Sequence, residues 1–272
     1  MSKIDNYLII AHYHSKGLIR KDFLNFLKKT KKIFKKTILI STNIINKEKL
    51  KIPKHIVTIR RKNIGYDFFS YKIGCEYFLQ KFNKKLENKN LFFINSSILF
   101  VNSTRTINAI KSIKIKKNEM WGFTKSYELK EHIQSYFFSF SAIILKDKDI
   151  LSWWKKIKPF TKRQAIIDKY ELGLSSLMIK KNVKLCSLFK KNIKLKSINF
   201  FQKINQRFKE VFLKEIKIYK KNPTNYFWKD IYTRYGIVKI ELIKKNPKKI
   251  NISKLKKILK KKRLLVVDAL DN

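Results

Sequence analysis

Short apolar runs alternate with amphipathic stretches through the first hundred residues, and this alternation restricts the fold more than any other feature of the sequence. Two stretches carry apolar side chains at helical spacing, residues 20–34 and 68–82. Four runs have the length and composition of strands, residues 7–11, 37–41, 56–59 and 91–94. Strands that alternate with helices form βαβ units, so we expect a Rossmann-like α/β fold with a mostly parallel central sheet flanked by helices.

The pattern changes after residue 120. We expect two further strands, at 121–124 and 134–145, and then helices at 150–158, 165–170, 171–181 and 202–219. The last forty residues are rich in lysine, and residues 254–263 have the spacing of a basic amphipathic helix. We therefore expect one α/β domain over residues 1–200 and a helical, lysine-rich C-terminal extension over residues 201–272 that packs on it.

The formal net charge of +46 favours anionic partners, either nucleic acid, an anionic membrane face or a phosphorylated small molecule. Only eight of the 65 basic residues are Arg, and the lysines are spread along the whole chain. Proteins that read bases or grip phosphates in a fork rely on Arg. We therefore do not expect specific nucleic-acid binding, but we keep a basic nucleic-acid-binding protein as a rival function. Peripheral contact with anionic lipid is a further open alternative.

The lengths of the apolar runs and the spacing of the cysteines indicate the cellular compartment. The apolar stretch at residues 7–11 is too short for a signal-peptide core, and the longest apolar runs, 91–101 and 135–145, are too short to span a bilayer. Cys75 and Cys186 have neither metal-binding nor redox spacing. We therefore expect a cytoplasmic protein, either free or peripheral on the inner membrane face.

The segment Arg61 to Phe68 is the best candidate for a ligand-binding loop. It lies between an expected strand and an expected helix, and such loops meet at the carboxyl edge of an open α/β sheet, where nucleotides bind. Gly65 permits a tight backbone, Asn63 and Asp67 can bind a base or ribose, and Arg61 can neutralise a diphosphate. The alternative is an ordinary turn in which Asp67 caps the helix.

Several segments together resemble the rhamnan synthesis F family, glycosyltransferases related to the GT-A fold. They include Gly65-Tyr66-Asp67-Phe68 and Asn95-Ser96-Ser97. The resemblance follows the order of the chain through residues 7–13, 61–74, 93–97, 121–126, 132–137, 170–172, 222–229 and 246–247. It thus covers most of residues 7 to 247.

The resemblance implies a GT-A-like catalytic domain in residues 1–200 that transfers a sugar, often rhamnose, from a nucleoside-diphosphate donor to a cell-surface polysaccharide. The acceptor would be a glycan or a lipid-linked glycan, and no organic cofactor is expected. The nucleotide-sugar site would be formed by His12, Arg61, Asn63, Gly65, Tyr66, Asp67, Lys72, Asn95, Ser96, Ser97 and Gln134.

Metal dependence is left open by one departure from the family pattern. The chain has Asn95-Ser96-Ser97 where the family has Asn-Asp-Ser, and a hydroxyl does not replace a carboxylate as a ligand for Mg²⁺ or Mn²⁺. Asp67 is then the one remaining candidate for a metal ligand. Alternatively, Arg61 and nearby lysines stabilise the leaving diphosphate, or the chain is a catalytically silent relative that binds a glycan or a partner.

Transfer with inversion needs a base for the acceptor hydroxyl, and Glu171 is our first candidate because it begins an expected helix similar to the acidic helix of related enzymes. Glu128 and Glu131 are reserve candidates. His132 is the second expected catalytic residue, since it precedes an aromatic strand and could contact donor or acceptor. The alternatives are a Glu171 that only favours the helix dipole and a His132 that is structural.

Overall fold

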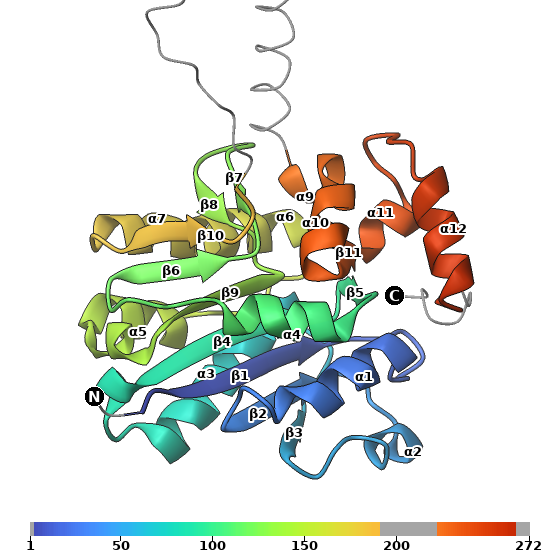
Figure 1. Cartoon of the computed structure of the whole chain (residues 1–272). Helices are drawn as coiled ribbons and strands as arrows, with labels where there is room; N and C mark the ends of the chain where they lie inside the picture. Colours follow the sequence, from blue (N-terminus) through green and yellow to red (C-terminus); the bar gives the residue numbers. More distant parts are fainter. Residues whose placement is uncertain (1–2, 191–221, 265–272) are drawn as a thin grey trace, which may run out of the picture.

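The structure is a computed structural model, and it describes residues 3–190 and 222–264. A seven-stranded sheet runs through its centre in the order β10-β6-β9-β4-β1-β2-β3 (Figure 1). β9 is antiparallel to both of its neighbours, and the other neighbouring pairs are parallel. The strands are β1 (Asp5–His12), β2 (Lys36–Ser41), β3 (Ile56–Arg60), β4 (Lys89–Asn95), β6 (Glu119–Gly122), β9 (Phe137–Ser141) and β10 (Lys184–Ser187).

Helices cover both faces of this sheet, because its central strands are apolar on both sides. Tyr7 and Ile9 of β1 pack on one face with α3 (Tyr66–Phe82), α5 (Lys148–Lys155) and α7 (Leu172–Lys180). Leu8 and Ile10 pack on the other face, which α1 (Lys21–Thr30) and α4 (Ser103–Lys111) cover (Figure 1). The expected α/β fold with a mostly parallel sheet between helices is therefore confirmed.

The C-terminal part packs on this body through a second, two-stranded sheet. β11 (Ile237–Lys239) pairs antiparallel with β5 (Ile98–Phe100), which follows β4 directly. Leu255 and Leu259 of the last helix are fully buried against this ribbon. The helices here are α9 (Pro223–Tyr226), α10 (Trp228–Tyr235), α11 (Ile240–Lys244) and α12 (Ser253–Lys261), so the expected basic helical tail is present. The expected helix at 202–219 and the proposed domain boundary at residue 200 lie outside the described residues.

Three expected elements differ from the structure. The strand expected at 134–145 is only β9, after which the chain turns into the 3₁₀ helix η2 (Ala142–Lys146). The apolar run continues through η2 because Ala142 and Leu145 are buried in the core, so apolar character alone did not separate strand from helix. The helices expected at 165–170 and 171–181 form one continuous stretch, in which α6 (Arg163–Ile166) passes through the π-helical turn η3 (Ile167–Glu171) into α7.

Short elements complete the described part of the chain: α2 (Asn46–Lys49), η1 (Leu86–Asn88), β7 (Lys125–Ser126) and β8 (His132–Ile133). β7 and β8 pair with each other beside the main sheet. Across the described ranges, no helix combines the length and the apolar character needed to cross a bilayer.

Candidate functional site

Two of the expected site residues meet where β4 ends and α3 begins. Asn95 is the last residue of β4, and its amide Nδ2 donates to Asp67 Oδ2 at 2.8 Å. α3 is capped by Gly65, whose φ of 73° is left-handed, so Asp67 lies within the first helical turn and is not the N-cap residue. A side chain at Gly65 would also place its Cβ 2.7 Å from Pro159 Cα. Both the left-handed backbone and this close approach therefore require glycine here.

Ser135 connects Asp67 to the expected base. Its hydroxyl donates to Glu171 Oε2 at 2.7 Å and lies 3.4 Å from Asp67 Oδ2. The Ser135 carbonyl in turn accepts a hydrogen bond from the Tyr71 hydroxyl at 2.9 Å, and the Tyr71 ring is fully buried. The core therefore fixes the backbone that holds the two carboxyl groups near each other. Sequence reasoning did not single out Ser135.

Glu171 also forms an ion pair with His132, since Nε2 of the ring lies 3.4 Å from Oε1 of the carboxylate. The Nδ1 nitrogen of His132 donates to the Lys130 carbonyl at 2.8 Å. Both ring nitrogens thus face acceptors, as suits an imidazolium. The two expected catalytic residues are brought together, although β8 and η3 are far apart in sequence.

The π-helical turn determines where Glu171 points. Glu171 is the last residue of η3 inside a continuous helical stretch, so it does not lie at a helix N-terminus as expected. The turn is fixed by Tyr170, whose hydroxyl bonds both the amide and the carbonyl of Lys158. Single π-turns often occur at functional sites because they change the direction of one side chain.

Lys239 of β11 brings a positive charge to this group. Its Nζ donates to Ser97 Oγ at 3.2 Å and lies 4.6 Å from the centre of the Tyr136 ring. The Ser97 hydroxyl donates to Asn95 Oδ1 at 2.6 Å, which continues the network to Asp67. Sequence reasoning missed Lys239, and nothing in the sequence distinguishes this lysine from the many others in a chain with 65 basic residues.

Burial and mutual charge shift the titration of these groups. Burial raises the pKa of Asp67, and the neighbouring Glu171 raises it further. Burial also acts to raise the pKa of Glu171, but the bonds from His132 and Ser135 outweigh it and the pKa lies below its usual value. For His132, burial acts to lower the pKa, whereas Glu171 and the Lys130 carbonyl raise it above its usual value. Burial lowers the pKa of Lys239 despite the nearby carboxylates.

The other expected binding residues of the loop at 61–66 either bond protein acceptors or face solvent. Arg61 donates to Ser70 Oγ at 2.8 Å and to backbone carbonyls of its own loop, and burial lowers its pKa to about 10. Tyr66 donates to the Thr161 carbonyl at 3.2 Å, and Asn63 is exposed. Arg61 therefore braces the loop in this structure, and its guanidinium faces protein acceptors.

Four other expected binding residues have partners outside this group. His12 is 3% exposed, bonds Ser41 Oγ and has a pKa lowered to about 3, mainly by burial. Ser96 Oγ bonds both the amide and the carbonyl of Tyr13, which ties the ends of β1 and β4 together. Lys72 donates to the Lys155 and Ile157 carbonyls, and Gln134 bonds Thr124, Thr224 and Asn222.

The side chains at this site do not form a set of ligands that fits a divalent cation. All four carboxylate oxygens of Asp67 and Glu171 face protein donors: the Phe68 amide, Asn95, Ser135 and His132. Ser96 faces Tyr13, and the ammonium of Lys239 already supplies positive charge near both carboxylates. Within residues 3–190 and 222–264, no cluster of three His, Cys, Asp or Glu side chains is arranged to hold a metal ion.

The chain is similar to several known proteins. It is 27% identical to virulence protein VirA of Vibrio anguillarum, over 70% of this chain and 63% of that protein, and 25% identical to the uncharacterized protein y4gN of Sinorhizobium fredii, over 61% of this chain and 44% of that protein. The chain thus spans less than two thirds of the length of these relatives. Among solved structures, the glycosyltransferase GlyE of Streptococcus pneumoniae matches with a TM-score of 0.45 and 11% identity, over 99% of this chain and 62% of that one.

The strongest of these findings is a match to a family model. The model for rhamnan synthesis protein F matches residues 37–266, which include Asp67, Asn95, His132, Glu171 and Lys239. The resemblance read from the sequence segments is therefore confirmed over most of the chain, and the chain belongs to the rhamnan synthesis protein F family.

Proposed function

We propose that this protein is a glycosyltransferase that moves a sugar, with rhamnose as the first candidate, from a nucleoside-diphosphate donor to a glycan or lipid-linked glycan acceptor. The observation that carries the proposal is the group formed by Asp67, His132, Glu171 and Lys239, in a member of the rhamnan synthesis protein F family. The group adjoins the end of β4 at the carboxyl edge of the sheet, where open α/β sheets bind nucleotides.

Glu171 is suited to accept the proton of an acceptor hydroxyl. The pair with His132 keeps its carboxylate ionised, and the side chain retains 16% exposure; in this proposal the acceptor reaches Glu171 from that exposed side. In the proposed step, the acceptor oxygen bonds to the sugar's anomeric carbon, its proton passes to Glu171, and the bond from that carbon to the diphosphate breaks. His132 is a positioning residue in this scheme, because it acts through Glu171.

The leaving diphosphate gains negative charge as this bond breaks, and the scheme assigns its stabilisation to Lys239. The ammonium lies next to Ser97, and so next to the end of β4. Arg61 is less suited to this role, because its donors face the Ser70 hydroxyl and loop carbonyls. Asp67, Gly65 and the brace of Arg61 would shape the loop that holds the nucleotide. No step is assigned to a metal ion, since the donor set does not fit one.

The decisive experiment is a transfer assay with the full chain, nucleotide-linked sugars and glycan acceptors. Glu171→Gln keeps the size and the hydrogen-bonding ability of the side chain but removes the base, so transfer should fall by about 100-fold or more while nucleotide binding by calorimetry is retained. Glu131→Gln is the matched control, since Glu131 is 40% exposed and its ion pair with Lys125 lies outside the group around Glu171. Full transfer activity in Glu171→Gln would overturn the assignment.

A catalytically silent relative is the second candidate, and the position of Ser96 favours it. The hydroxyl that replaces the family's acid is turned to Tyr13 and takes no part in the group around Glu171. Hydrolysis and transfer should therefore be measured with a panel of donors, with and without Mn²⁺. Binding of a donor or glycan without turnover under any of these conditions would favour the silent relative over the enzyme.

A further inference from the structure

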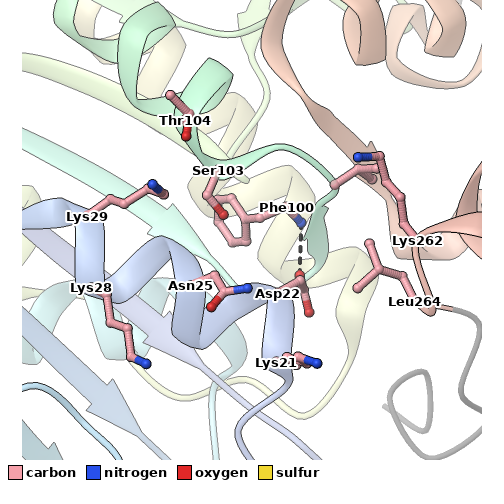
Figure 2. Close-up of a pocket in the computed structure, with 11 residues that line it drawn as sticks. Lys21, Asp22, Asn25, Lys28, Lys29, Phe100, Ser103, Thr104, Lys262 and Leu264 are labelled. Atoms are coloured by element: carbon pink, nitrogen blue, oxygen red, sulfur yellow. Dashed lines mark hydrogen bonds between the residues drawn. The ribbon is translucent and has the colours of Figure 1, made fainter.

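A separate hollow of about 530 Å³ lies between α1, the start of α4 and the end of α12 (Figure 2). Its apolar wall is formed by Phe100 of β5 and the adjacent Val101, both almost fully buried. None of Asp67, His132, Glu171 and Lys239 lines it. Any ligand of this hollow would therefore have its own set of contacts, apart from the group proposed for catalysis.

The rim of the hollow is lined by four lysines. Lys21, Lys28 and Lys29 project from α1, and Lys262 follows α12 (Figure 2). None of these four lysines has an ion-pair partner within the described part of the chain. Asp22 is the carboxylate in the wall, but it is already neutralised by Arg20 at 3.0 Å and accepts from the Phe100 amide at 2.9 Å.

The start of α4 adds hydrogen-bond donors to the same hollow. The Asn102 side chain caps the Arg105 amide, and the first amides of a helix, here those of Ser103 and Thr104, have no intrahelical acceptor. The Ser103 side chain lines the hollow, yet the residue is only 8% exposed. Its hydroxyl forms no hydrogen bond with another described residue, so it remains available as a donor to a ligand in the hollow.

We propose that this hollow is a binding site for a phosphate group. A phosphate oxygen would accept from the Ser103 hydroxyl and from the free amides at the start of α4, where the helix dipole also favours an anion. The lysines of α1 and Lys262 would neutralise the remaining charge, and Asp22 does not oppose this because Arg20 already pairs with it. The phosphate belongs either to a lipid headgroup or to a soluble phosphorylated compound.

Inorganic phosphate is the probe for the site, and the readout must be resolved by residue because the whole chain is strongly basic. In a titration followed by NMR of backbone amides, Ser103 and Thr104 should shift and saturate together, while Gly65 and Ser97 report separately on the candidate catalytic group. Ser103→Ala should weaken phosphate binding at Thr104 by about threefold or more, without loss of folding, because the hydroxyl has no partner among the described residues.

A charge-matched pair of variants separates a site from general attraction. The combined changes Lys21→Gln, Lys29→Gln and Lys262→Gln should weaken binding at Thr104 by at least about tenfold. Lys54→Gln, Lys114→Gln and Lys117→Gln remove the same charge from exposed lysines away from the hollow and should leave binding within about twofold. Equal weakening in the two variants, or no saturable shift at Ser103 and Thr104, would overturn the proposal.

The source of the phosphate is distinguished by sedimentation with vesicles of phosphatidylcholine that contain phosphatidic acid. If the hollow binds a lipid headgroup, the variant at Lys21, Lys29 and Lys262 should lose more vesicle binding than its matched control. If it binds a soluble compound, both variants should bind vesicles equally, while only the first loses the response to inorganic phosphate. Since neither readout uses sugar transfer, failure of the proposed enzyme activity would not affect this test.

Discussion

At the scale of single residues, the pairing of His132 with Glu171 sets the electrostatics of the candidate site. Both side chains are largely buried, with 8% and 16% exposure, so their attraction is weakly screened. The pKa of His132 is raised and that of Glu171 is lowered, which means that each group favours the charged form of the other. The pair should therefore stabilise the fold as well as hold the proposed base.

Stability should depend on this pair in a defined pH range. The raised pKa of His132 contributes stability that is complete below its usual value of 6.5 and is lost as pH rises through the folded value. The lowered pKa of Glu171 contributes stability above 4.5 that is lost as pH falls. His132→Gln should thus lower the free energy of unfolding by about 1–3 kcal/mol near about pH 6, and by less near about pH 9, in urea titrations.

His55 provides a control with the opposite sign. Its pKa is lowered, mainly by burial, and its Nε2 lies 3.0 Å from Thr30 Oγ1. A lowered histidine pKa contributes stability that is complete above 6.5 and lost as pH falls, so His55→Gln should cost more near about pH 9 than near about pH 6. The same pH trend in both variants would show that the His132 effect is not due to its charge.

The sequence indicated which polar residues lie near the candidate site better than it indicated which of them contact one another. Asp67 and Asn95 could be placed together because both follow strands that end at the same edge of a parallel sheet. Ser96 and Gln134 have the same polar character and lie nearby in sequence, but their side chains are bonded to Tyr13 and Thr124. Whether a side chain enters a site depends on its rotamer and on the hydrogen-bond partners that it finds in the folded protein. A sequence motif specifies neither the rotamer nor these partners.

At the scale of secondary-structure elements, long apolar runs were predictable and short strands were not. β1, β2 and β4 are buried on both faces, and that double burial makes them stand out as apolar runs. β11 has only three residues, and it is a strand because it pairs with β5, which lies far earlier in the chain, as at the Val238–Leu99 pair. Pairing over such a separation comes from tertiary packing, so local pattern did not indicate it.

The register of β11 has a direct functional consequence. Lys239 pairs with Ile98, and a shift by one residue would turn an apolar side chain toward Ser97 in place of the ammonium. Lys239→Met keeps the apolar stem and removes the charge, so we expect kcat/KM for sugar transfer to fall by about 100-fold, as when a group that stabilises transition-state charge is lost. Steady-state kinetics with the preferred donor would measure this.

Lys229→Met is the matched control for that variant, since Lys229 is exposed on α10 and has no ion-pair partner among the described residues. It should retain transfer within about twofold. Unchanged kcat/KM in Lys239→Met would remove this lysine from the proposed mechanism. A loss of nucleotide affinity with unchanged kcat would instead assign Lys239 to donor binding alone.

At the scale of the whole molecule, the net charge of +46 comes from basic residues spread along the entire sequence. The 19 acidic residues are outnumbered by 65 basic ones, and two of the acids, Asp67 and Glu171, belong to the candidate site. Like charges that face solvent repel one another in the folded state more than in the expanded unfolded chain. The apolar cores on the two faces of the sheet therefore have to stabilise the fold against repulsion between the surface charges.

Salt should consequently stabilise this protein. The Debye length falls from about 10 Å at 0.1 M to about 3 Å at 1 M salt, which screens repulsion between exposed lysines much more than contacts in the core. Exposed ion pairs such as Arg163–Glu241 weaken over the same range, but they are few beside the excess of lysines. We expect Tm in calorimetry to rise with NaCl, by about 2–4 °C for each kcal/mol of repulsion that is relieved.

A charge-reversal variant tests whether repulsion is the cause. Lys54→Glu, Lys114→Glu and Lys117→Glu change exposed side chains that form no ion pairs within the described ranges, so they reduce the excess charge without removing a contact. The variant should have a higher Tm than the wild type in low salt and should gain less from added NaCl, since less repulsion remains to be screened. A Tm that falls with salt in both proteins would mean that native ion pairs contribute more to stability than lysine repulsion removes.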